Sequence, residues 1–214
     1  MTLFQLSWRN SIYKPGAFVL SILLFALGIG LISFLLLLDH QVQDKFEKNL
    51  AGIDLVVGAK GSPLQLILSN MYFIDAPTGN ISLGEAKPFL NPKNPLIDEA
   101  IPLSLGDSYG GYRIVGTQRS FLDLYDATFN KGHWVKDNFD VVLGATTAEK
   151  LDLPIGSEFK STHGFTEDED LEHDHEENFK VVGILNATGA VIDQLILCNN
   201  PTYWYVHVEH DHEG

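Results

Sequence analysis

The amino-acid sequence predicts an α+β protein: one N-terminal transmembrane helix that extends into a stalk, followed by a mixed, largely antiparallel extracytoplasmic domain with short helices. Two observations predict this fold class. Residues 17–38 form an apolar run without a charged residue. Beyond residue 100, short apolar stretches separated by turn residues alternate with short helical patterns, which is typical of an α+β domain with an antiparallel sheet.

The apolar run Ala17–Leu38 is 22 residues long, and Ser21 and Ser33 are its only polar side chains. A helix of this length rises about 33 Å, enough to cross a hydrocarbon core of about 30 Å. A cleaved secretory signal has a shorter apolar region followed by small residues at the cleavage site. A buried core helix seldom runs this far without a charge. We therefore predict a retained transmembrane helix.

The distribution of charge predicts the orientation of this helix. Residues 1–38 contain Arg9 and Lys14 and no acidic residue, whereas residues 39–214 carry 12 basic and 28 acidic residues, a net charge of −16. Positively charged flanks stay in the cytoplasm, so we expect the N-terminus inside and residues 39–214 outside the cytoplasm. The acidity of the outer part argues against nucleic acid and anionic lipid as its partners and favours cations.

Three regions follow along the chain. Residues 1–15 are predicted to be a cytoplasmic amphipathic segment that lies on membrane lipid, because apolar residues such as Leu3, Leu6 and Ile12 recur on one helical face. Residues 16–50 are the transmembrane helix and stalk, in which Val42 and Phe46 continue the helical spacing. Residues 51–214 form the outer domain.

The start of the outer domain contains a predicted strand at residues 53–58, a turn, and a helix over residues 64–73 that we expect to be buried. Pro63 suits the first position of that helix. The glycines at 58 and 61 flank Lys60, but the spacing of a phosphate-binding loop is absent, which argues against nucleotide binding there.

The remaining elements are short. Ser82 and Glu85 have the spacing of a capping box and predict a helix start. Apolar runs predict strands at residues 100–105, 112–116, 140–144, 157–162, 179–185 and 193–198, with short helices at 120–125 and 145–151. The single cysteine, Cys198, excludes an internal disulfide and lies in an apolar run, so we expect a buried strand residue.

Several segments resemble one type of membrane protein over nearly the whole chain. The most specific is Asp54–Ser69 (DLVVGAKGSPLQLILS), and others are Pro77–Asn80, Gly106–Tyr109, Tyr112–Gly116, Val141–Gly144, Val181–Ile184 and Asp193–Leu197. With the order of span, stalk and outer domain, they resemble the N-terminal half of the MacB/LolC/FtsX type of ABC transporter permease.

The resemblance implies a location in the bacterial inner membrane and a periplasmic domain at residues 51–214. It also implies that the chain is the N-terminal portion of a four-span permease, with a periplasmic domain incomplete at its C-terminus. Such a permease works as a dimer with a second copy and couples ATP hydrolysis by a cytoplasmic ATP-binding subunit to movement of the periplasmic domain. It is not an enzyme itself. Two other functions stay open: a membrane-anchored periplasmic domain that binds or buffers zinc, and an FtsX-like regulator of a cell-wall enzyme.

Histidines gather with acidic residues in the C-terminal third of the chain. The candidate metal ligands are His163, His173, His175, His207, His210 and His212. Imidazole and carboxylate groups suit zinc, which takes three or four such ligands. The alternative is that residues 166–178 form a solvated acidic loop whose histidines bind nothing. No catalytic residue is predicted, because the motifs G-x-S-x-G and H-E-x-x-H are absent.

Overall fold

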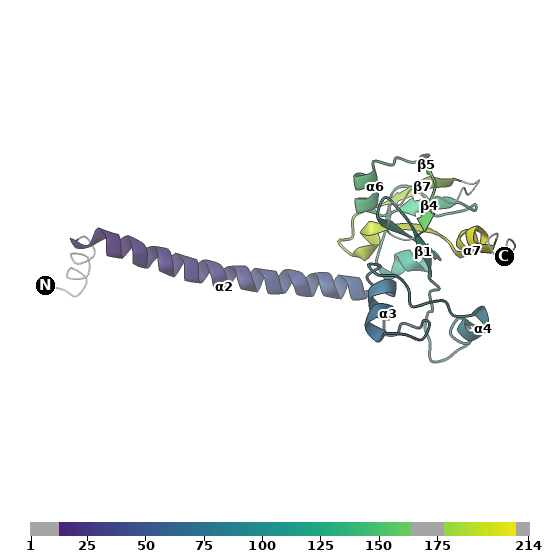
Figure 1. Ribbon diagram of the computed structural model, residues 1–214, viewed down its shortest axis with the longest axis horizontal. Helices are drawn as coiled ribbons and strands as arrows, with labels where there is room; N and C mark the ends of the chain where they lie inside the picture. The colour runs from purple at the N-terminus through teal and green to yellow at the C-terminus, as the bar shows by residue number, and fades with distance from the viewer. Residues whose placement is uncertain (1–12, 164–177, 209–214) are drawn as a thin grey trace. The chain divides into compact units, whose positions relative to one another are not determined.

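The computed structural model describes residues 13–163 and 178–208 of the chain. The chain divides into two compact units, residues 1–47 and 48–214 (Figure 1). The predicted amphipathic helix at the N-terminus lies largely outside the described residues.

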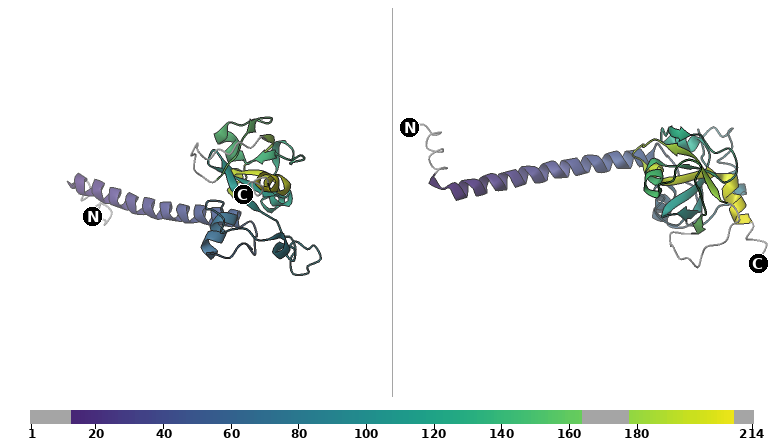
Figure 2. Two further views of the ribbon diagram at one scale, coloured as in Figure 1. Left: turned by 45° about the vertical axis from the view of Figure 1, so that its right-hand side comes forward. Right: turned by 90° about the horizontal axis from the view of Figure 1, so that it is seen from above.

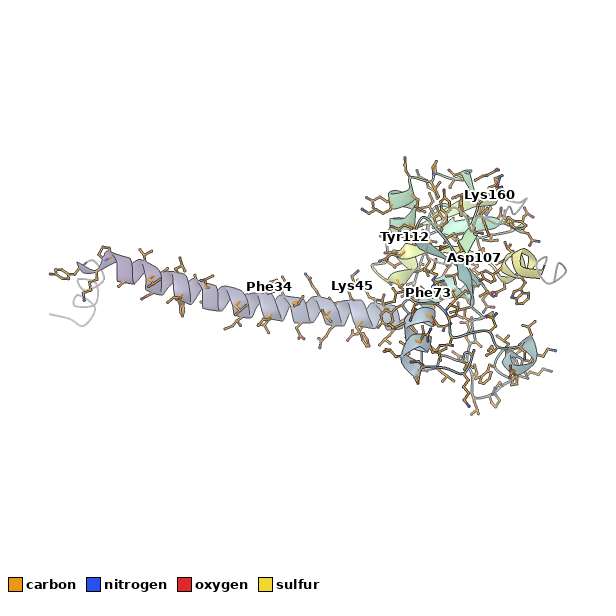
Figure 3. All side chains as sticks on the ribbon, in the orientation of Figure 1. Phe34, Lys45, Phe73, Asp107, Tyr112 and Lys160 are labelled. Carbon is orange, nitrogen blue, oxygen red and sulfur yellow. The ribbon has the colours of Figure 1, made fainter. Side chains whose placement is uncertain are left out.

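The first unit consists of the long helix α2, Pro15–Leu50, whose last three residues belong to the second unit. Pro15 occupies the first helical position, where its missing N–H costs nothing. By length and composition α2 can cross a membrane, with a mean hydropathy of 2.7 in its most apolar window. None of its residues is buried, and side chains such as Phe34 and Lys45 project away from it (Figure 3). The predicted continuation of the helix through residue 50 is confirmed.

Helix α2 ends in two residues with left-handed backbone conformation. Ala51 has φ of +47° and Gly52 has φ of +72°. The N–H of Ile53 then donates to the carbonyl oxygen of Leu50 at 2.7 Å. Glycine adopts such a conformation without strain, which explains why the helix ends at this position.

The second unit is built on one mixed sheet of eight strands. The strands are β1 (Ser104–Tyr109), β2 (Tyr112–Thr117), β3 (Phe129–Gly132), β4 (Asp140–Leu143), β5 (Glu158–Phe159), β6 (Thr162–His163), β7 (Phe179–Leu185) and β8 (Leu195–Asn199). Their order is β3-β7-β4-β8-β2-β1-β6, and β5 pairs with β7. Pairs β2–β8 and β4–β7 are parallel and the others antiparallel. The predicted α+β class with a largely antiparallel sheet is confirmed.

Both faces of the sheet are buried, and alternate residues of the central strand β8 serve opposite faces. Leu195 and Leu197 join a cluster with Phe121 and Leu122 of α5 (Ser120–Leu124). Ile196 and Cys198 join the cluster on the other face, against which α6 (Ala145–Leu151) packs. Residues next to each other in a strand point to opposite faces, so burial on both sides explains why β8 is an uninterrupted apolar run.

Residues 53–100 contribute two short helices, α3 (Pro63–Asn70) and α4 (Leu83–Ala86), which lie on the same side of the sheet in Figure 1 and in the left view of Figure 2. Ser62 caps α3 by accepting a hydrogen bond from the N–H of Gln65. The predicted capping box of Ser82 and Glu85 is present in α4.

The structure corrects five expectations about individual elements. The strand expected over residues 100–105 is β1, which spans Ser104–Tyr109 instead. The stretch 157–162, expected as one strand, contains the two short strands β5 and β6. Residues 53–58 pair with no strand in the part of the chain that the structure describes. Helix α3 is only partly buried, because Leu64 and Ile67 are 65% and 41% exposed. The strand expected over residues 193–198 begins at Leu195, since Val191–Gln194 form the short 3-10 helix η2.

Candidate functional site

The first candidate site lies within the second unit, where the last residues of α2 meet η2, and is called the junction. The side-chain oxygen Oδ1 of Asn49 accepts a hydrogen bond from the N–H of Val191 at 2.9 Å, across 142 residues of sequence. Val191 is the first residue of η2, which leads directly into β8. The last turn of the helix is therefore bonded to the segment that enters the central strand of the sheet.

The loop that receives Asn49 is held from within by a buried carboxylate. Asp193 is 5% exposed. Its oxygens accept hydrogen bonds from the N–H and hydroxyl of Thr188, both at 2.9 Å, and from the N–H of Gly189 at 2.8 Å. Hydrogen bonds to a carboxylate are about twice as strong as neutral ones. The bonds to Asp193 therefore fix the backbone of residues 188–189 next to the junction.

Two close backbone contacts add to this fixed geometry. A side chain at Gly144, the residue before α6, would overlap the backbone of Ile192 and Asp193. Ala51, just after α2, packs against the core cluster that contains Phe73 and Ile192. The end of α2 and the start of α6 therefore both contact η2.

A buried polar cluster lies at strands β2 and β1, which follow β8 in the order of the sheet. Asp107, Arg113 and Tyr203 are 1%, 4% and 8% exposed. Asp107 is labelled within the sheet domain in Figure 3. Nη2 of Arg113 donates to the carbonyl oxygen of Asp75 at 2.8 Å, which attaches the segment after α3 to the sheet. Burial lowers the pKa of Arg113, while Tyr203, Asp75 and Asp107 oppose that shift.

The phenol of Tyr203 and the thiol of Cys198 are chemically unreactive. Burial, followed by the charge of Asp107, raises the pKa of both Tyr203 and Cys198. A thiol is reactive as the thiolate, so Cys198 is an inert core residue, as expected. A side chain at Gly106 would overlap the hydroxyl of Tyr203, which places α7 (Asn200–Val208) close to β1.

The structure describes two of the six predicted metal ligands by their backbone only. His163 pairs with Asp107 at the β1–β6 edge. His207 lies in α7, one turn after Tyr203. His173, His175, His210 and His212 lie outside the described residues. Among the side chains that the structure describes, which do not include those of His163 and His207, no group of three or more from His, Cys, Asp or Glu is arranged to hold a metal ion.

The sequence did not point to the junction itself. Asn49 is one of several polar residues on the stalk, and nothing local connects it with Val191. The one available signal was Asp193, a carboxylate at the edge of an apolar run, because buried carboxylates in proteins are paired or hydrogen-bonded.

These observations define an α+β domain that follows an apolar helix long enough to span a membrane. The model of the MacB-like periplasmic core domain matches residues 18–209. The chain therefore belongs to this family, the periplasmic domain of MacB/FtsX-type ABC transporter permeases. The resemblance inferred from the sequence is confirmed.

Three solved structures are similar to parts of the chain at low sequence identity. The periplasmic region of MacB from Actinobacillus actinomycetemcomitans is 15% identical, with a TM-score of 0.40, and the match covers 57% of this chain and 56% of that one. A domain of a putative permease protein from Porphyromonas gingivalis is 13% identical, with a TM-score of 0.35, covering 50% and 51%.

A third structure is the extracellular domain of the noncanonic ABC-type transporter YknZ from Gram-positive bacteria. It is 14% identical, with a TM-score of 0.30, and the match covers 52% of this chain and 56% of that one. The matched part thus spans about half of the length of each of these three structures. No curated protein sequence matches the chain.

Proposed function

We propose that this chain is a permease subunit of an ABC transporter that couples ATP hydrolysis in the cytoplasm to movement of its periplasmic domain. The observation that carries this proposal is the hydrogen bond between Asn49 and Val191. It joins the last turn of a helix that can span a membrane to η2, the segment that leads into the central strand β8. Membership of the MacB-like family supports the transporter class.

The junction suits the transmission of movement because its parts are fixed to one another. A helix transmits an axial shift along its length, since each turn is hydrogen-bonded to the next. An axial shift of α2 reaches η2 through the hydrogen bond between Asn49 and Val191. The hydrogen bonds to the Asp193 carboxylate hold the backbone of residues 188–189 in a fixed conformation. In a close-packed interior such a displacement is passed on to neighbouring groups.

The remaining parts of the proposal concern partners and orientation. The N-terminus lies in the cytoplasm of a bacterial cell, where Arg9 and Lys14 flank the span. A separate cytoplasmic subunit binds and hydrolyses ATP, and a second permease copy completes the membrane assembly. This chain itself performs no catalysis.

Purification from native membranes tests the proposal. The tagged full chain, extracted in mild detergent, is expected to bring with it an ATP-binding subunit, identified by mass spectrometry, and a vanadate-sensitive ATPase activity. Purification without any ATP-binding protein, under conditions that retain other membrane complexes, would contradict the transporter function.

A transition-metal site is the second proposal, and the backbone placement of two candidate ligands favours it. His163 pairs with β1, and α7, which carries His207, packs against β2, the other neighbour of β1. One histidine-containing segment therefore lies beside β1 and the other beside β2, the neighbour of β1. The ligands would come from His163, His173, His175, His207, His210 and His212, with zinc as the metal.

Zinc titration of the full chain in detergent tests this site. The double variant His173→Ala/His210→Ala is expected to lose zinc binding, measured by isothermal titration calorimetry. The control is His133→Ala, whose imidazole forms a hydrogen bond with the carbonyl oxygen of Trp134. Equal binding by the wild type and the double variant would remove the site from consideration. An FtsX-like role in regulating a cell-wall enzyme stays a prediction.

A further inference from the structure

Residues 50–53, here called the terminal turn, end helix α2 in a conformation that does not suit their sequence. The N–H of Ile53 donates to the carbonyl oxygen of Leu50, and both central residues have positive φ, +47° at Ala51 and +72° at Gly52. Two central residues with positive φ are the mark of a type I′ turn, in which glycine, asparagine and aspartate dominate. Gly52 meets this requirement and Ala51 does not.

Ala51 is therefore strained in the terminal turn. For a residue with a Cβ atom the left-handed helical conformation is disfavoured about 5- to 30-fold relative to the right-handed one. Alanine also has the highest helix propensity of all residues. By its own preference Ala51 would continue α2, whereas the structure ends the helix at Leu50.

The sequence of the terminal turn also fits a longer helix. If Ala51 were the last helical residue, Gly52 would follow it as the left-handed glycine with which many helices end. A Cβ atom at Gly52 would meet no atom within 4 Å, so the glycine is needed for its backbone conformation and not for space. Gly52 can thus end the helix in either case.

Contacts within the second unit hold Ala51 in the disfavoured conformation. Its side chain packs against the buried cluster that includes Phe73 and Ile192. Two residues earlier, Asn49 accepts the hydrogen bond from the N–H of Val191. Ala51 is half-buried, and its methyl group contributes little apolar area to this packing. Residues that their surroundings hold in strained conformations cluster at switch regions of proteins.

We propose that the terminal turn has two conformations and switches the contact between α2 and η2 on and off. In the closed conformation, which the structure shows, Ala51 is left-handed and Asn49 is bonded to Val191. In the open conformation Ala51 is right-handed, α2 extends through residue 51, and Gly52 alone ends the helix. The change at residue 51 redirects the backbone on either side of it. Opening therefore withdraws Ala51 from the buried cluster and breaks the bond to Val191.

The role of this switch in coupling rests on the proposed function. Movement of α2 reaches η2 while the terminal turn is closed, because the bond from Asn49 is then present. In the open conformation α2 moves without η2. A force on α2 shifts the equilibrium, since the two conformations differ in the length of the helix and in its contacts.

Distances between two spin labels test for the two conformations. The labels are attached to Lys45→Cys in α2, at the exposed residue labelled in Figure 3, and to Asp123→Cys in α5, on the full chain in detergent. Cys198 is buried and stays unlabelled. Double electron–electron resonance is expected to show two distance populations. Ala51→Gly removes the strain of the closed conformation and is expected to reduce the second population at least fivefold.

A matched control separates this switch from a general effect of strain. Asp152 has φ of +51° at the end of α6, so Asp152→Gly relieves the same conformation at another helix end. It is expected to leave the two populations unchanged. Ala51→Val is expected to enlarge the second population several-fold, because a β-branched residue resists positive φ most strongly. A single population that neither substitution of Ala51 alters would overturn the proposal, as would equal effects of Ala51→Gly and Asp152→Gly.

Hydrogen exchange supplies a measurement without labels. The N–H of Val191 loses its acceptor whenever the terminal turn opens, whereas Leu197 lies in the central strand and is released only when the sheet opens. After correction for intrinsic rates, the N–H of Val191 is expected to exchange at least tenfold faster than that of Leu197. Ala51→Gly should slow it by about 5- to 30-fold. Equal protection of residues 191 and 197 in the wild type would show that the turn opens only with the whole domain and would overturn the proposal.

The switch and the proposed function fail separately. Two distance populations that respond to Ala51→Gly, in a chain that purifies without an ATP-binding subunit, would support the switch and contradict the transporter function. An ATP-binding subunit that is present, together with a single population unchanged by either substitution of Ala51, would do the opposite.

Discussion

The guanidinium of Arg113 donates from Nη2 to the backbone oxygen of Asp75 at 2.8 Å, from a position that is 4% exposed. Arg113 lies in β2 beside the central strand β8, whereas Asp75 follows α3. One buried cation thus joins residues near α3 to the interior of the sheet. Four predictions follow from this and related contacts.

Replacing Arg113 is expected to destabilise the sheet domain strongly. Arg113→Ala removes the bond to Asp75 and the charge beside the buried carboxyl group of Asp107, and breaking one partner of a buried charged pair costs about 3–5 kcal/mol. Thermal unfolding of the full chain in detergent, followed by near-UV circular dichroism, measures the effect. The control is Arg119→Ala at an exposed position. Similar melting temperatures for the two variants would show that Arg113 carries no such role.

The Asn49 side chain is expected to matter for coupling more than for stability. Asn49→Ala leaves the N–H of Val191 without its acceptor, at a cost of about 1 kcal/mol. In the assembled transporter this variant is expected to hydrolyse ATP with reduced transport. Asn49→Asp keeps an acceptor oxygen and should restore transport. Gln43→Ala, at an exposed position of the same helix, is the control. Full transport by Asn49→Ala would contradict the coupling role of the junction.

The Asp193 carboxylate is expected to be needed for the conformation of the loop that contains Thr188 and Gly189. Asp193→Ala removes the acceptor of three hydrogen bonds, from the N–H and hydroxyl of Thr188 and from the N–H of Gly189. The substitution is expected to lower the free energy of unfolding by about 2–4 kcal/mol. Hydrogen exchange should show faster exchange of the N–H groups of residues 188, 189 and 191. Asp123→Ala, at an exposed position, provides the comparison. Unchanged protection of these amides would indicate that the loop is held by other contacts.

Alkaline pH is expected to destabilise the domain through Tyr125. Burial, followed by the charge of Tyr72, raises the pKa of Tyr125 to about 12, and its hydroxyl has no hydrogen-bond partner among the described residues. Between pH 10 and 12 the unfolded chain loses this proton while the folded chain keeps it. Stability is therefore complete below pH 10 and falls as pH rises to 12.

The substitution Tyr125→Phe tests that prediction. It is expected to leave stability near pH 7 nearly unchanged and to raise the pH of alkaline unfolding, measured by circular dichroism. Tyr13→Phe, at an exposed residue before α2, is the control and should have no effect. If both variants unfold at the wild-type pH, the Tyr125 phenol is not the titrating group.

The features that the sequence predicted correctly are those that depend on neighbouring residues. The uncharged run Ala17–Leu38 and the capping box of Ser82 and Glu85 each need only a local pattern. Strand β4 was expected because a strand buried on both faces reads as a continuous apolar run. Strand β7 was expected from its own apolar residues, which are buried at alternate positions.

Features that depend on distant partners were missed. The segment 53–58 reads as a strand, yet apolar composition does not specify whether another strand lies beside it. Residues 191–194 form η2 instead of strand, because Asp193 bonds the preceding loop. The contact between Asn49 and Val191 joins residues that share no pattern at all.

The position of β8 determines when during synthesis the domain can fold. Its neighbours β2 and β4 are completed by residue 143, but the strand between them ends at Asn199. Until the ribosome has added residue 199, β1 and β2 cannot join β4 and β7, and both partial sheets expose open edges. Domains dominated by such late, non-local pairing fold slowly. On its passage across the membrane the nascent chain is therefore expected to need a holding chaperone until its last strand has been translocated.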